Sequence, residues 1–104
     1  LSFKENCPDL RNTKVIDLIK SLKAYKCNVD VYDPWVDQNK AKQEYNIELV
    51  KTLITGVYDG IILAVAHNEF KAFTASEIRA LGKESHILFD VKHLLQLDEV
   101  DGRL

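Results

Sequence analysis

The sequence predicts an α/β protein, a Rossmann-like three-layer sandwich built on a parallel sheet. Residues 60–66 form a continuous apolar run, which is typical of a strand buried on both faces of such a sheet. Helical patterns separate each expected strand from the next. Parallel strands need such crossovers, because the end of one strand lies at the opposite edge of the sheet from the start of the next.

An amphipathic helix is expected over residues 13–26. Asn12 or Thr13 suits its N-cap, because short polar side chains accept hydrogen bonds from the first free N–H groups of a helix. One face of this helix carries apolar side chains at the spacing i, i+3, i+4 and i+7, namely Val15, Leu18, Ile19 and Leu22.

Three shorter elements are expected next. Residues 28–32 alternate between polar and apolar and predict a strand, which the Asp33-Pro34 step ends. Residues 38–45 predict a polar helix, and residues 48–54 predict a second short helix.

The rest of the chain alternates strand, helix and strand. The apolar strand over 60–66 is followed by a helix over 75–81, with Gly82 in the left-handed position beyond its end, and by a last strand over 86–91. In this fold class a strand precedes the first helix, but only three residues precede the opening loop. We therefore expect that the first strand is truncated and that the chain is a fragment of a longer protein.

Composition excludes several classes of function. A chain of 104 residues with 46% hydrophobic content is expected to form one domain. The net charge of −2 argues against a nucleic-acid binder, and no apolar run approaches the roughly 18 residues that span a membrane. Two cysteines, Cys7 and Cys27, are too few for a disulfide scaffold or a zinc site, which fits a reducing cytoplasm.

The opening segment, residues 3–14, predicts an anion site. It leads into a helix N-terminus, where free N–H groups and the helix dipole favour negative charge, and Lys4 and Arg11 would add full positive charges. The alternative is a solvated loop with an ordinary helix cap.

Loops that follow the strands are expected to meet this segment at one edge of the sheet, where such folds bind ligands. They bring Lys92, His67, Trp35 and Phe70, a mixture that suits a phosphate attached to a base or sugar. Two of these residues have a structural alternative: His67 would bond the backbone and Trp35 would cover the sheet edge. Asp33 would form a turn rather than bind a ribose.

Four segments together resemble the C-terminal, UDP-binding domain of the UDP-glucose/GDP-mannose dehydrogenase family. The resemblance covers essentially the whole chain and is closest to the branch acting on UDP-N-acetylhexosamines. Its segments are Phe3-Lys4 with Asp9 and Arg11, then residues 29–34, 64–70 and 89–92.

The resemblance implies roles for individual residues. Phe3 and Lys4 match positions that contact the UDP-sugar, and Arg11 matches an arginine that reaches NAD. Members with an Asp-Gly-Arg-Arg type loop after the last strand use an arginine there for the substrate. This chain has Asp90-Val91-Lys92-His93 instead, so Lys92 is the candidate replacement and His93 the open alternative.

The resemblance also implies an NAD-dependent enzyme that oxidises the sugar C6 alcohol to a carboxylate for polysaccharide biosynthesis. Such enzymes are cytoplasmic homo-oligomers. The family's nucleophilic Gly-Gly-x-Cys-x-Pro motif and dinucleotide fingerprint are absent from this sequence. We therefore assign no catalytic or metal-binding residue to this chain, expect NAD to be bound mainly by an absent N-terminal domain, and expect the isolated domain to be inactive.

A different class of function is a stand-alone receiver-like or regulatory α/β binding module. Asp33, Asp90 and Lys92 loosely imitate the acidic cluster and lysine of a receiver. The paired acids that should follow its first strand are absent.

Overall fold

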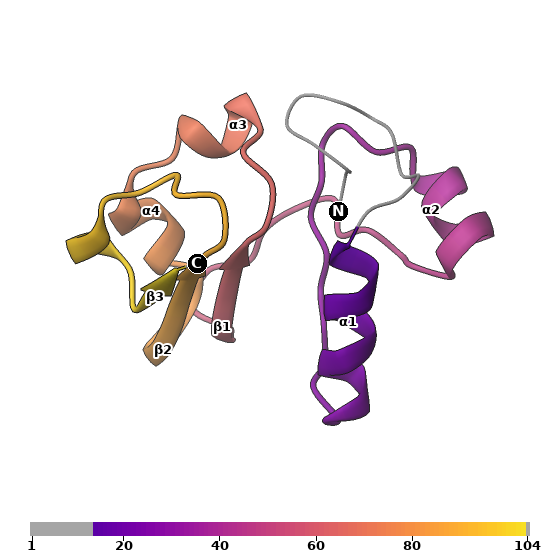
Figure 1. The fold of residues 1–104 in the computed structure, drawn as a ribbon, viewed down its shortest axis with the longest axis horizontal. Coiled ribbons are helices and arrows are strands. Elements are labelled where there is room, and N and C mark those ends of the chain that lie inside the picture. Colours follow the sequence, from indigo (N-terminus) through magenta and orange to yellow (C-terminus); the bar gives the residue numbers. More distant parts are fainter. Residues whose placement is uncertain (1–13, 104) are drawn as a thin grey trace. The chain divides into compact units, whose positions relative to one another are not determined.

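The structure is a computed structural model that describes residues 14–103 (Figure 1). The chain divides into two compact units, Leu1–Thr52 and Leu53–Leu104, and each is described by itself.

The first unit begins with helix α1, Val15–Ala24, which confirms the predicted helix with shorter ends. Ile19 of the predicted apolar stripe is buried, and Val15, Leu18 and Leu22 are half-buried, while Ile16 is a further buried residue that the stripe did not include. The N-cap is Lys14, which makes no side-chain cap hydrogen bond, whereas the expected caps lie outside the described residues. Tyr25 is the C-cap, and Lys26 directly beyond it is left-handed, with φ of 64°.

Helix α2, Gln38–Tyr45, has the predicted bounds. The Asp37 carboxylate accepts hydrogen bonds from the N–H groups of Asn39 at 2.8 Å and Lys40 at 3.3 Å, which fixes where the helix begins. Asn46 ends it with φ of 55°. The buried core of this unit consists of Ile16, Ile19, Val36, Ala41 and Ile47.

Two predictions in the first unit were wrong. Residues 28–32 form no regular strand, because only Val31 pairs, in an isolated parallel bridge with Leu49. Residues 48–54 form no helix, because their backbone groups have other partners: Val50 N–H donates to the Val31 carbonyl at 2.9 Å, and Leu49 N–H donates to the Gln38 side chain. These hydrogen bonds hold the backbone of Leu49 and Val50 extended, so these N–H groups do not bond within a helix.

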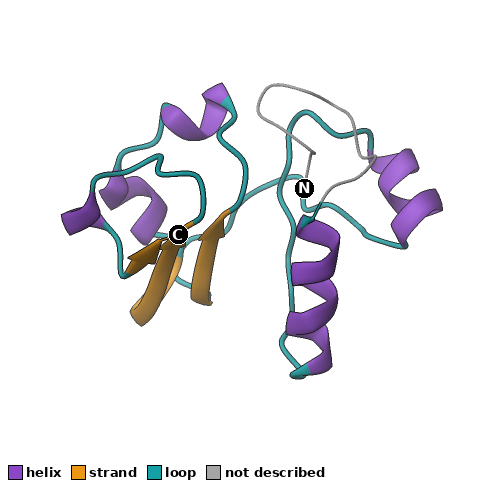
Figure 2. Cartoon of the chain, in the orientation of Figure 1, coloured by secondary structure: helices purple, strands orange, loops and turns teal. Residues whose placement is uncertain are grey.

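The second unit holds a three-stranded parallel sheet in the order β1-β2-β3. Figure 2 shows its strands as orange arrows. The strands are β1, Tyr58–Leu63, β2, Gly82–Asp90, and β3, Gly102–Arg103. This confirms the α/β class and the parallel pairing of the two predicted strands. The short strand β3 and the preceding 3₁₀ helix η1, Leu97–Glu99, were not predicted.

The crossover from β1 to β2 contains α3, Asn68–Lys71, and α4, Ala75–Arg79. Thr74 and Glu77 form a capping box at the start of α4, with Glu77 N–H donating to Thr74 Oγ1 at 3.2 Å and Thr74 N–H to Glu77 Oε1 at 3.1 Å. The expected helix over 75–81 is confirmed in shorter form. The expected cap at Gly82 was wrong, because this residue begins β2. A Cβ at position 82 would collide with the His86 ring, which is why the strand starts with a glycine.

The core of the second unit lies on one face of its sheet. Leu63, Ile78 and Leu88 are buried there. On the other face, Ile62 is 39% exposed and Ile87 is 62% exposed. The expectation of a strand buried on both faces was therefore wrong for β1, since its alternate residues meet different surroundings. No helix within residues 14–103 is long and apolar enough to cross a membrane.

Arg79 and Asp101 join the C-terminal segment to the sheet. Asp101 Oδ2 accepts hydrogen bonds from Leu88 N–H at 2.7 Å and from Arg79 Nη1 at 3.1 Å. Arg79 also donates to the Glu99 carbonyl from Nε at 3.3 Å and Nη2 at 3.1 Å. On its other side Arg79 Nη1 lies 3.2 Å from His86 Nε2, and His86 Nδ1 lies 2.7 Å from the Lys83 carbonyl oxygen.

The Leu88 N–H, and next the Arg79 guanidinium, hold the pKa of Asp101 below its ordinary value of 3.8. A carboxyl group whose pKa is lower in the folded state than in the unfolded state stabilises the fold at any pH above its unfolded-state pKa. This stabilisation is lost as the pH falls through the folded-state pKa. We predict that Asp101→Asn lowers the melting temperature at pH 7. Acidification below pH 4 should then destabilise the variant less than the wild-type chain, as measured by thermal unfolding at both pH values.

Asp59→Asn is the matched control. The Asp59 side chain is 82% exposed and pairs with Lys83 at 3.2 Å, so its loss should leave the melting temperature unchanged. Equal losses in both variants would contradict a specific role for Asp101.

Candidate functional site

Most residues of the predicted site lie outside the described part of the chain. Phe3, Lys4 and Arg11 belong to the opening segment, which the structure does not describe, so their roles stay predictions. Of the four residues to which the resemblance gives a binding role, only Lys92 lies within the described residues.

The carboxyl ends of β1 and β2 lie side by side. Leu63 pairs with Asp90, and Val91 N–H donates to the Leu63 carbonyl at 2.9 Å. The loops that carry His67 and Lys92 therefore leave the same edge of the sheet, as the sequence predicted for this pair. The loop with Trp35 belongs to the first unit.

The loop after β2 is organised around a buried carboxylate. Asp90 is 0% exposed. Its Oδ1 accepts a hydrogen bond from Lys92 N–H at 3.1 Å, and its Oδ2 accepts one from Leu95 N–H at 2.8 Å. Between them His93 adopts a left-handed backbone with φ of 56°. The Lys92 side chain is exposed and makes no ion pair with any residue between 14 and 103, so its ammonium group can meet an anionic ligand.

His67 follows β1 and is 0% exposed. Its carbonyl accepts hydrogen bonds from Phe70 N–H at 3.0 Å and Lys71 N–H at 3.1 Å, which begins α3. The imidazole and the Phe70 ring lie 5.3 Å apart at 56°. Such burial fits a structural histidine better than a ligand contact at the sheet edge.

Asp33 forms the turn that the sequence offered as an alternative to a ribose contact. It is 5% exposed, and its Oδ1 accepts a hydrogen bond from Trp35 N–H at 2.9 Å. Trp35 is 36% exposed. Its two predicted roles, covering the sheet edge and stacking on a ligand, both stay predictions.

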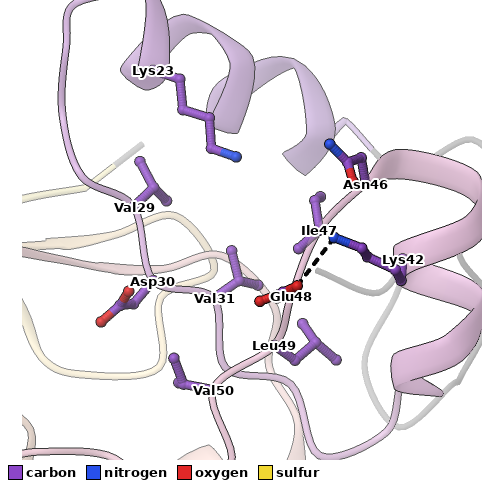
Figure 3. Close-up of a pocket in the computed structure, with 10 residues that line it drawn as sticks. All are labelled: Lys23, Val29, Asp30, Val31, Lys42, Asn46, Ile47, Glu48, Leu49 and Val50. Atoms are coloured by element: carbon purple, nitrogen blue, oxygen red, sulfur yellow. Dashed lines mark hydrogen bonds and ion pairs between the residues drawn. The ribbon is translucent and has the colours of Figure 1, made fainter.

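A groove of about 430 Å³ lies within the first unit (Figure 3). Figure 3 shows Lys42 bonded to Glu48, with 3.1 Å between Nζ and Oε1. Lys23 and Asp30 add one charge of each sign, so the groove has no net preference for anions. Its apolar wall includes Val29, Val31, Ile47, Leu49 and Val50. Among residues 14–103, no residue of the predicted site lines it. Sequence reasoning missed the groove, because two of its walls meet at the unforeseen Val31–Leu49 bridge.

Potential metal ligands do not gather in the described chain. Across residues 14–103 no group of three His, Cys, Asp or Glu side chains is placed to hold an ion. Cys27 is a free, exposed thiol.

Comparison with known proteins identifies close relatives along the whole chain. The family model described as "UDP-glucose/GDP-mannose dehydrogenase family, UDP binding domain" matches residues 1–97. A UDP-N-acetyl-D-glucosamine 6-dehydrogenase of Pseudomonas aeruginosa is 58% identical over 104 residues, which are 100% of this chain and 25% of that protein. The enzyme of the same name from Salmonella typhi is 47% identical over 99% of this chain and 24% of its own length. Protein CapL of Staphylococcus aureus is 42% identical over 97% of this chain and 24% of its own length. The chain thus spans about a quarter of the length of these curated relatives.

The Asp33 turn generates a test of the local structure. We predict that Asp33→Ala lowers the free energy of unfolding by about 1–3 kcal/mol, because Trp35 N–H loses its buried acceptor. Denaturant unfolding followed by the fluorescence of Trp35, the sole tryptophan, measures this loss. Asp33→Asn keeps one acceptor oxygen and should lose less stability. Equal losses would mean that the charge of Asp33, rather than its turn, matters.

Proposed function

This chain belongs to the UDP-glucose/GDP-mannose dehydrogenase family, and we propose that residues 1–104 are the C-terminal UDP-binding domain of a longer NAD-dependent enzyme. The proposed enzyme oxidises the C6 alcohol of a UDP-sugar to a carboxylate for polysaccharide biosynthesis. The observation that carries the proposal is the match of the UDP-binding domain model to residues 1–97. Membership of the family confirms the resemblance inferred from the sequence.

A UDP-N-acetylhexosamine is the proposed substrate. The 58% and 47% identical relatives are both named UDP-N-acetyl-D-glucosamine 6-dehydrogenases. The residues proposed to contact the substrate are Phe3, Lys4 and Lys92. The exposed ammonium group of Lys92 supports its part, because it lies at the edge of the sheet where α/β folds bind ligands.

NAD is proposed to be held mainly by a part of the enzyme outside this chain, with Arg11 reaching toward it. The described residues fit a dinucleotide poorly. The turn that follows β1, residues 64–67, contains no glycine, so its backbone cannot approach a pyrophosphate as closely as a dinucleotide fingerprint does. We therefore expect no NAD⁺ reduction by the isolated chain, and we expect the full enzyme to be a cytoplasmic homo-oligomer.

The geometry disfavours a receiver-like module. A receiver needs an exposed acceptor aspartate, but Asp33 is 5% exposed and Asp90 is 0% exposed. Both carboxylates already accept backbone hydrogen bonds, Asp33 from Trp35 and Asp90 from Lys92 and Leu95. Neither is placed to be phosphorylated.

Calorimetric titration of the chain with UDP, uridine and inorganic phosphate tests the proposed function. We expect UDP to bind at least about tenfold more tightly than uridine, because charge-assisted bonds to phosphate add more than about 1.4 kcal/mol. Equal affinities for UDP and uridine would contradict a diphosphate site. Magnesium-dependent labelling by acetyl phosphate, without UDP binding, would favour the receiver-like module instead.

Lys4→Ala and Arg11→Ala are predicted to impair different ligands in the full enzyme. Loss of Lys4 should raise the KM for the UDP-sugar by roughly tenfold to a hundredfold and leave NAD⁺ use nearly unchanged. Loss of Arg11 should weaken NAD⁺ use, while UDP still binds the domain. Steady-state kinetics with each substrate varied in turn measures both effects.

Lys83→Ala is the control for these variants, since Lys83 pairs with Asp59 at the surface. The assignment of roles would be wrong if Arg11→Ala abolished UDP binding and Lys4→Ala did not weaken it.

A further inference from the structure

We propose that Asp90 is a positioning residue, which acts on the nucleoside diphosphate ligand through Lys92. Its carboxylate fixes the loop over residues 91–95, so that the backbone of Lys92 is held at the ligand-binding edge before the ligand arrives. This inference rests on the proposed function, since it assumes that Lys92 meets the anionic part of UDP.

Burial excludes a direct role for Asp90 in binding. The residue is 0% exposed, and a buried negative charge would repel a diphosphate rather than attract it. Among residues 14–103 its carboxylate oxygens have two donors, both of them backbone N–H groups: Lys92 at 3.1 Å and Leu95 at 2.8 Å. A carboxylate that accepts such bonds organises the backbone that donates them.

The loop needs this support because of its backbone shape. His93 has φ of 56°, a left-handed conformation that residues with a Cβ rarely adopt without help from their surroundings. The two Asp90 bonds lie on either side of His93, and Val91 N–H is held by the Leu63 carbonyl at 2.9 Å. Leu95 also packs against the core formed by Leu63, Ile78 and Leu88.

Lys92 is therefore fixed through its backbone while its side chain stays exposed. A loop that is already in its bound shape loses less conformational freedom when the ligand binds, so affinity is higher than with a loose loop. Removing one Asp90 bond should release part of this constraint without touching the ammonium group itself.

Asp90→Asn tests the inference, since the amide has nearly the same shape but only one acceptor oxygen. We expect the Kd for UDP to rise about fivefold, the change in an equilibrium constant that corresponds to one net hydrogen bond of about 1 kcal/mol. Hydrogen exchange at the amide of Lys92 or Leu95 should accelerate. In a Lys92→Ala background the same change should have little further effect on the Kd, because Asp90 acts through Lys92.

Asp101→Asn is the matched control. It makes the same chemical change to a carboxylate of the same unit that also accepts a backbone N–H, from Leu88 at 2.7 Å. It should lower stability and leave the Kd for UDP unchanged, which separates positioning from general destabilisation.

Three outcomes would overturn the inference. The first is an unchanged Kd for UDP in Asp90→Asn. The second is a double variant, Asp90→Asn with Lys92→Ala, whose rise in Kd equals the product of the rises in the two single variants. The third needs no variant: in the wild-type chain, a Leu95 amide that exchanges as fast as an unstructured one would show that the anchor is absent. Failure of the wild-type chain to bind UDP would refute the proposed function itself. Calorimetric titration of the wild-type chain with UDP distinguishes that failure from the three outcomes above.

Discussion

Parallel pairing of β1 with β2 is the constraint on which the second unit depends. Two parallel strands cannot be joined by a tight turn, so residues 64–81 must cross over the sheet, and the crossover provides α4 with its Thr74–Glu77 capping box. Ile78 on α4 then closes the core over Leu63 and Leu88. The same pairing aligns Leu63 with Asp90, which brings two loops to one edge. The sheet edge that carries Lys92 is thus a result of strand register.

Four aspartates within residues 14–103 fix the backbone around them. Asp33, Asp37, Asp90 and Asp101 each accept hydrogen bonds from main-chain N–H groups, and they fix in turn a tight turn, a helix start, a loop and a terminal segment. The carboxylates of Asp33 and Asp90 are thus buried inside their loops, while the Lys92 side chain stays at the surface. This division suits a domain whose expected ligand is an anion.

Elements with a strong local pattern could be predicted from the sequence. The bounds of α2 follow from Asp37 and Asn46 at its ends, and the apolar run around β1 was enough to predict a parallel sheet. Elements that depend on distant partners could not be predicted. The extended backbone at Leu49 depends on the Gln38 side chain, and a strand as short as β3 has no periodicity to read. At the candidate site the sequence marked Lys92. It could not mark Asp90 as a loop anchor, because that role depends on which N–H groups the folded loop turns toward the carboxylate.

The contacts of His86 have a consequence for its reactivity. The Lys83 carbonyl can only accept a hydrogen bond, so His86 Nδ1 carries the hydrogen, and the Arg79 guanidinium can only donate, so Nε2 supplies its lone pair to Arg79. Both ring nitrogens are thus committed to neighbours in the fold. A metal ion at Nε2 would therefore have to displace the Arg79 guanidinium first. A reagent that modifies histidines should therefore spare His86 for as long as this corner of the domain stays folded.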